Sequence, residues 1–216
     1  MKISKYVKLV KETGRCIVAD VAGDGIWLGN GYALYRATGL PWMEGDEQVR
    51  TVLDVPEKSW KKIYLQQEHF ENIRDVMGLN LADYDDQEQQ TEKVRVAAAP
   101  DGLWASCRRC ADGELIFYRE GLLAPFMDEI RDSDYIIYTV RRTANGQRYL
   151  ILHDGMTVLA AIMPMKVVSE EYLASLAEFE ALCTEQLYRE REREAAMPAE
   201  AEPPEAEQVG MEDGEE

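Results

Sequence analysis

Long apolar runs, cysteine and histidine are all scarce in this sequence, and each shortage excludes a class of protein. The longest apolar stretches, such as residues 156–165, fall short of the roughly 20 residues that a membrane-spanning helix needs. The amino terminus is charged, but Lys8 and Lys11 interrupt the segment where a signal peptide would have its apolar core. We therefore expect no membrane span, no membrane partner and a cytoplasmic location.

Cysteine is too rare to supply a disulfide scaffold, which favours a reducing compartment. Cys107 and Cys110 have the spacing of a zinc-ligand pair, but a tetrahedral site needs a second pair of cysteines or histidines, which the sequence lacks. The alternative is two side chains on or near a strand end. A redox role would need the pair at a strand-to-helix turn, whereas its neighbours predict a hairpin. We expect no bound metal.

Catalytic motifs are also missing. The two histidines, His69 and His153, stand far apart and belong to no nucleophile or metal motif. The glycines between Gly23 and Gly31 lack the Gly-Lys-Ser/Thr ending of a phosphate-binding loop, so hairpin turns explain them better. Because no nucleophile, base and orienting group can be named together, we expect a protein without enzymatic activity and without a cofactor.

The net charge of −17 is unevenly distributed along the chain. Residues 1–82 hold eleven basic and eleven acidic residues, whereas residues 190–216 hold eleven acidic residues and two arginines. The last segment is also rich in proline and poor in large apolar side chains, so a disordered acidic tail is predicted over 194–216. Before it, apolar residues at spacings of three and four predict a helix over 169–193, with Ser169 as its N-cap.

Two segments repeat one order of predicted elements, a helix followed by a three-stranded β-meander. Asn30-Gly31 closes the last hairpin of the first copy, and Asp154-Gly155 closes that of the second. The first copy is predicted as a helix over 4–12 and strands over 16–21, 26–29 and 32–37, and the second as a helix over 122–131 and strands over 135–141, 148–153 and 156–163.

The connecting segments complete an α+β fold of repeated helix and antiparallel β-meander units. Pro56 begins a further helix. An exposed loop is expected at about 80–92, where acidic residues and glutamines offer little that could be buried. Further strands are predicted over 94–98, 102–108 and 114–118, and the predicted division of the chain is a domain over 1–120, a shorter helix-meander-helix unit over 121–193 and the acidic tail over 194–216.

Two of the predicted helices carry lysines at close spacing. Spacings of three and four place each set near one helix face, where it could meet phosphate groups without reading base sequence. The alternative is an ordinary solvated helix face. The lysines are Lys2, Lys5, Lys8 and Lys11 in the first helix, and Lys58, Lys61 and Lys62 after Pro56.

The succession of a short helix, a meander with a tight Asn-Gly or Asp-Gly turn and a helix start at Val-Pro-x-Lys resembles the sliding clamps of DNA replication. Residues 6–10, 16–37 and 52–63 carry this resemblance, with a partial second match over 126–173. In that family the helices line a ring with basic residues facing the duplex, and sheets join across subunit edges. The resemblance therefore implies a homo-oligomer whose DNA-binding residues are Lys5, Lys8, Lys11, Lys58, Lys61 and Lys62.

The chain departs from the clamp pattern in its second half. Residues 121–190 hold only half of a second clamp domain, and its helix carries Asp128 and Glu129 where the family has a basic face. Two hypotheses result. The first is a non-catalytic, clamp-like accessory protein of DNA replication that binds duplex backbone or a replication protein. The second is an acidic protein-interaction module, of the kind that phages or mobile elements encode, with no DNA binding.

Overall fold

The computed structural model describes residues 1–98 and 104–196, and the chain falls into two compact units. Met1–Val167 forms the first unit, and the second contains one long helix, α5 (Glu170–Ala196). The predicted acidic tail thus begins inside α5, and its remainder, 197–216, lies outside the described residues. Among the helices of the described segments, none has the length and apolar composition that crossing a membrane requires.

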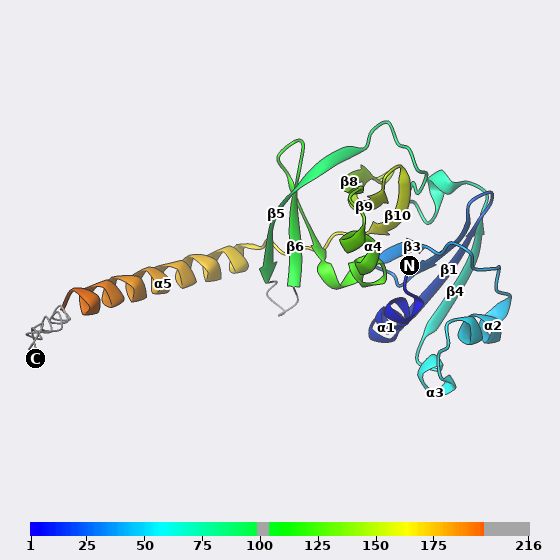
Figure 1. Ribbon diagram of the computed structural model, residues 1–216, viewed down its shortest axis with the longest axis horizontal. Helices are drawn as coiled ribbons and strands as arrows, with labels where there is room; N and C mark the ends of the chain where they lie inside the picture. Colours follow the sequence, from blue (N-terminus) through cyan, green and yellow to red (C-terminus); the bar gives the residue numbers. More distant parts are fainter. Residues whose placement is uncertain (99–103, 197–216) are drawn as a thin grey trace, which may run out of the picture. The chain divides into compact units, whose positions relative to one another are not determined.

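The strands of the described residues form one ten-stranded sheet (Figure 1). β1 and β4 pair in parallel, and the other described pairs are antiparallel, so the predicted α+β class is confirmed. In order across the sheet, the strands are β4 (Tyr64–Phe70), β1 (Arg15–Val21), β2 (Gly25–Gly29), β3 (Ala33–Arg36), β10 (Thr157–Ile162), β9 (Arg148–Asp154), β8 (Ile136–Arg142), β5 (Gln89–Ala98), β6 (Trp104–Cys110) and β7 (Leu115–Arg119).

The two meanders lie next to each other in this sheet, joined by the pairing of β3 with β10. Helix α1 (Ile3–Thr13) precedes the first meander. The helix predicted over 122–131 is divided into a 3₁₀ helix, η2 (Glu120–Phe126), and a short helix, α4 (Met127–Asp132). Pro125 accounts for the division, because proline has no backbone N–H to donate and its ring crowds the preceding turn.

Each face of the sheet carries its own apolar core. On one face, α1, α2 (Gly45–Val52), α3 (Glu57–Trp60) and η2 contribute buried side chains that pack with alternate residues of the strands. On the opposite face, the segment 70–81, which includes the 3₁₀ helix η1 (Ile73–Asp75), packs against the remaining strand positions. The sheet is therefore covered by helices on one side and by an irregular strap on the other.

The loop predicted at 80–92 is irregular up to Glu88 and exposes Asp83, Tyr84, Asp86 and Gln87, but its first and last residues differ from the prediction. Leu81 is fully buried in the core beneath the strap, and β5 begins at Gln89. The side chain of Arg141, itself 1% exposed, donates hydrogen bonds to the carbonyl oxygens of Asn80 and Ala82, at 2.8 and 2.7 Å. A buried guanidinium thus satisfies backbone groups that were expected to remain in water.

The division of the chain and three of its elements also differ from the sequence-based predictions. The division near residue 120 is not that of the structure, because β3–β10 and β5–β8 pairing joins the two halves into the unit Met1–Val167. The helix after Pro56 is a single turn, and α2 and β4 were not predicted. β4 lies at the sheet edge, and its sequence lacks the apolar alternation by which strands are recognised.

Candidate nucleic-acid interface

The packing of α1 fixes which way its lysines point. Tyr6, Val7, Leu9 and Val10 are buried against the sheet. The hydroxyl of Tyr6 donates a 2.8 Å hydrogen bond to the carbonyl oxygen of Gly29 in β2, and its ring packs edge-on against Tyr35, with centroids 5.9 Å apart. The lysines at the intervening positions must therefore face away from the sheet, and Lys5, Lys8 and Lys11 are all exposed.

The single turn of α3 is anchored through its tryptophan. Trp60 is 5% exposed, and its indole Nε1–H donates a 2.7 Å hydrogen bond to Asp46 of α2. This contact buries the apolar side of the turn, and Lys58, Lys61 and Lys62 are left in solvent.

The segment that follows α3, about fifty residues on in the sequence, lies beside the residue that ends α1. Gly14 ends α1 in the left-handed region, with φ of 67°, and its carbonyl oxygen accepts a 2.8 Å hydrogen bond from the N–H of Tyr64. A Cβ at Gly14 would lie only 3.5 Å from the carbonyl oxygen of Lys62. The six lysines singled out from the sequence therefore lie on neighbouring elements of one side of the sheet; we call this set the α1–α3 lysine surface.

Most lysines of this surface have no acidic side chain paired with their positive charge. Lys61 forms an ion pair with Glu57 at 2.8 Å. The other five lysines of the surface form no ion pair with any residue in the described part of the chain. Positive charge with no internal partner is available to an external anion.

The acidic residues of α4 mark where the α1–α3 lysine surface ends. Asp128 forms an ion pair with Lys2, and Glu129 forms one with the amino group of Met1 at 2.5 Å. Lys2 holds the pKa of the Asp128 carboxyl below its usual range. The basic surface thus begins after Lys2 and extends toward α3, and the acidic helix that departs from the clamp pattern neutralises the start of α1.

The cysteine pair shows no arrangement of the kind that holds a metal. Cys107 and Cys110 are both buried in β6, and their odd spacing directs them to opposite faces of the strand. Burial raises the pKa of the Cys107 thiol. Within the described segments, no group of three or more side chains of the metal-ligating types lies close together.

Sequence reasoning missed a buried polar cluster beneath the strap, formed by Glu88, Thr139, Arg141 and His153. Glu88 accepts hydrogen bonds from Arg141 at 2.8 Å, from Thr139 and from His153 at 2.6 Å. Burial would raise the pKa of Glu88, but these donors outweigh it and lower the pKa to about 2. Arg141 and His153 are 1% and 5% exposed and bond within the cluster, so we expect the cluster to fasten the segment 80–88 to the sheet. The signal available in the sequence was the run of acids at 83–88, which needed basic partners.

Comparison with protein-family models, with curated proteins and with solved structures found no match to this chain.

Proposed function

We propose that this protein binds the backbone of duplex DNA through the α1–α3 lysine surface, as a clamp-like, non-catalytic accessory protein of replication. The observation that carries the proposal is the placement of both lysine sets on the helical face of the sheet, where the segment after α3 lies beside the end of α1. Five of these side chains have no acidic partner among the described residues. Lysine ammonium groups neutralise phosphates without reading bases, so binding is independent of DNA sequence.

The acidic net charge does not oppose this role at short range. In about 0.1 M salt, charges separated by more than about 10 Å are largely screened from one another. A phosphate at Lys8 or Lys62 therefore responds mainly to nearby ammonium groups. About half of the net negative charge, −9 of −17, belongs to residues 190–216, which are not part of the unit that carries the lysines.

A clamp-like role also requires copies of the chain to associate through their sheet edges. β4 and β7 are the two end strands of the described sheet. The edge of β7 is partly covered, because the N–H of Met165 donates a 2.8 Å hydrogen bond to the carbonyl oxygen of Phe117. Association through β7 therefore needs residues 163–167 to move, whereas β4 offers backbone groups directly. Molar mass from light scattering, with and without duplex, measures whether copies assemble.

Fluorescence anisotropy of a labelled duplex tests the proposal. The double variant Lys8→Glu/Lys62→Glu is expected to lose roughly tenfold or more in affinity at about 0.1 M salt, because two phosphate contacts are lost. Lys93→Glu/Lys166→Glu changes the net charge equally at two exposed lysines that do not belong to the α1–α3 lysine surface, and should bind as the wild type does. Equal loss in both variants, or no binding by the wild type at low salt, would contradict the proposal.

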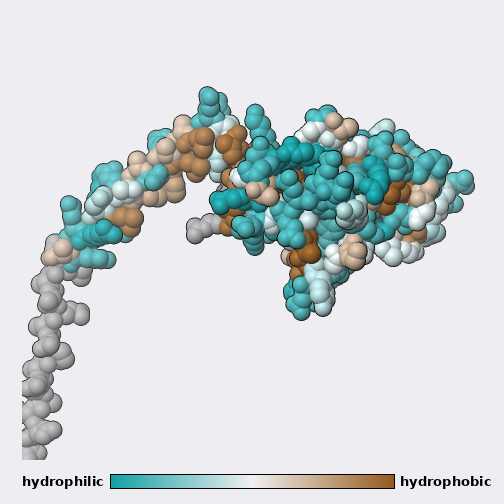
Figure 2. Space-filling view, turned by 90° about the horizontal axis from the view of Figure 1, so that it is seen from above, coloured by the Kyte–Doolittle hydropathy of each residue, from teal (hydrophilic) through white to brown (hydrophobic). Residues whose placement is uncertain are grey.

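A second candidate function, protein recognition through α5, is favoured by one observation. This helix exposes large apolar side chains along its length, visible as brown atoms in Figure 2. Isolated helices that expose apolar residues gain stability when a partner covers them. The variant Leu176→Glu/Phe179→Glu should abolish partner capture without changing duplex affinity. The exposed side chains are Leu173, Leu176, Phe179, Leu182, Leu187 and Tyr188.

A further inference from the structure

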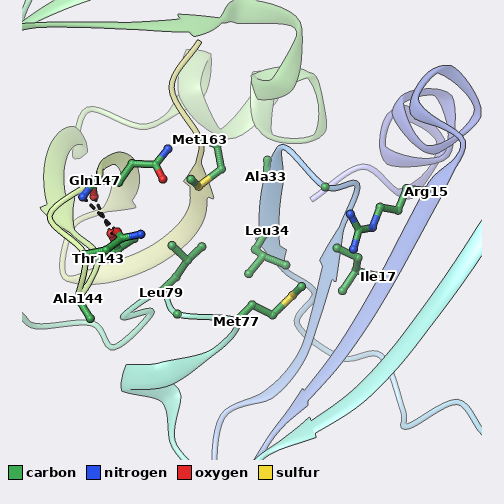
Figure 3. A pocket seen from close by; sticks show the side chains of 13 residues that line it. Arg15, Ile17, Ala33, Leu34, Met77, Leu79, Thr143, Ala144, Gln147 and Met163 are labelled. Atoms are coloured by element: carbon green, nitrogen blue, oxygen red, sulfur yellow. Dashed lines mark hydrogen bonds between the residues drawn. The ribbon is translucent and has the colours of Figure 1, made fainter. Parts of the chain in front are cut away.

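A cavity of about 440 Å³ lies on the strap side of the sheet, the face opposite α1. This volume is within the range of about 300–1,000 Å³ that small-molecule sites occupy. The walls are mainly aliphatic side chains and thioethers from separate parts of the chain (Figure 3). They are Ile17 of β1, Ala33 and Leu34 of β3, Met77 and Leu79 of the strap, and Met163 after β10.

Arg15 supplies a charge to this apolar cavity. Its guanidinium points into the space in Figure 3, on the side opposite the hairpin turn that contains Thr143 and Gln147. Its side chain donates a 2.8 Å hydrogen bond to the amide oxygen of Gln66, and no carboxylate in the described part of the chain pairs with it. A Cβ at Gly31 would lie 3.2 Å from Cδ of Arg15, so a glycine there leaves room for the arginine stem.

The opposite wall is electrically neutral. The Thr143 hydroxyl donates a 3.1 Å hydrogen bond to the carbonyl oxygen of Gln147, and the N–H of Thr143 bonds the same oxygen at 2.8 Å. The turn therefore satisfies these groups internally. Arg15 remains the one charged side chain among the residues that line the cavity.

Met77 is held in an unfavourable conformation to reach this cavity. It occupies the left-handed region, with φ of 56°, in a two-residue turn where Val76 and Leu79 exchange backbone hydrogen bonds of 2.9 and 3.0 Å. Asparagine or glycine is preferred at such a position, and methionine is disfavoured there. Strain of this kind tends to persist where a side chain has a task, and the Met77 side chain lines the cavity while remaining 37% exposed.

We propose that this cavity binds a small organic carboxylate with an apolar body. The carboxylate pairs with Arg15, whose planar guanidinium matches two carboxylate oxygens. The apolar body lies between Leu34, Met77 and Met163. Thioether side chains adapt to varied apolar shapes, so the body can be an alkyl or an aryl group. The site lies on the face of the sheet opposite α1 and shares no residue with the α1–α3 lysine surface, although Arg15 directly follows Gly14.

The proposal is tested by nuclear magnetic resonance of methionine methyl groups in the full chain, titrated with octanoate and separately with octanamide. The Met77 and Met163 signals, assigned with Met77→Leu and Met163→Leu, are expected to shift and saturate with octanoate. Octanamide should bind at least tenfold more weakly, and Arg15→Gln should remove this difference while keeping a polar partner for Gln66. Unmoved Met77 and Met163 signals, or equal affinity for acid and amide, would overturn the proposal.

One further variant and one further ligand test which residues form the site and which kind of ligand it takes. Met77→Asn gives the turn its preferred residue, so the thermal midpoint should rise while octanoate affinity falls at least threefold; unchanged affinity would contradict the assigned wall. A short apolar peptide with a free carboxyl terminus is the comparison ligand. If it binds tighter than octanoate, the small-molecule assignment is wrong.

Discussion

At the scale of single residues, buried polar side chains hold an irregular segment of the chain against the sheet. Arg141 and Glu88 form an ion pair at 2.8 Å, and Glu88 accepts further hydrogen bonds from Thr139 and His153. Arg141 also donates to the carbonyl oxygens of Asn80 and Ala82, but its buried Nε–H has no hydrogen-bond partner among the described residues. Removing one member of a buried charged pair leaves the other without compensation. The strap should therefore depend on this cluster for its attachment.

Glu88→Gln is expected to destabilise the protein by on the order of 2 kcal/mol at pH 7. The folded pKa of Glu88, about 2, lies below its ordinary value of 4.5. Its contribution to stability is therefore complete above about pH 4.5 and is lost as the pH falls toward 2. Urea unfolding of both proteins between pH 7 and pH 3 should show the difference shrinking on acidification. A pH-independent difference would show that charge is not its cause, and Asp86→Asn, at an exposed side chain, serves as the control.

Gly29 is expected to be the glycine least tolerant of a side chain. A Cβ there would lie 2.6 Å from Leu34 and 3.2 Å from Ile17, both of which are buried. Gly29→Ala should cost about 1–3 kcal/mol in the free energy of unfolding. Gly121→Ala is the matched control, because its Cβ would meet only Arg119 at 3.7 Å. Equal stability of the two variants would show that the sheet adjusts without cost.

At the scale of elements, the sequence predicts those parts whose local signals agree with their final surroundings. Both meanders were predicted strand by strand, because apolar segments and Asn-Gly or Asp-Gly turns mark them without reference to the rest of the chain. The strap at 70–81 and the segment 82–88 that follows it could not be predicted. Its order depends on Arg141 and His153, which are brought to it only by the sheet.

The candidate sites likewise have some features that local sequence predicts and others that depend on tertiary structure. Helix periodicity was enough to identify the lysines of α1, because buried Tyr6 and Leu9 fix the opposite face. The approach of the segment after α3 to Gly14 could not be predicted from local sequence, since it depends on the pairing of β4 with β1. The cavity beside Arg15 had no signal in the sequence, because its walls come from β1, β3, the strap and the β8–β9 turn.

Helix α5 should be dispensable for the folding of the first unit, since Met1–Val167 is compact by itself. Deletion of residues 168–216 is expected to leave the thermal midpoint within about 2 °C of that of the full chain, because surface changes away from the core alter stability little. Differential scanning calorimetry measures this directly. A large fall in the midpoint would mean that α5 contributes to the stability of the first unit, and would weaken the case for an external partner of its apolar side chains.

At the scale of the whole molecule, the sheet separates two candidate surfaces of different chemistry. The helical face carries exposed lysines suited to a polyanion, and the strap face carries an apolar cavity with one arginine. The sites share no residue, so substitutions far from their common border, such as Lys8→Glu and Met163→Leu, should each leave binding at the other site unchanged. Arg15 lies at that border, because it pairs in register with Tyr64, two residues after Lys62.

The salt dependence of duplex binding is the most direct test of the central claim. Affinity should be measured for two unrelated DNA sequences between about 50 and 200 mM salt. Contacts from five lysines predict a slope of about −4 to −5 for log K against log salt concentration, equal for both sequences. Lys8→Glu/Lys62→Glu should reduce that slope by about two, and Lys93→Glu/Lys166→Glu should leave it unchanged. A slope near zero, or an equal change of slope in both double variants, would contradict the account.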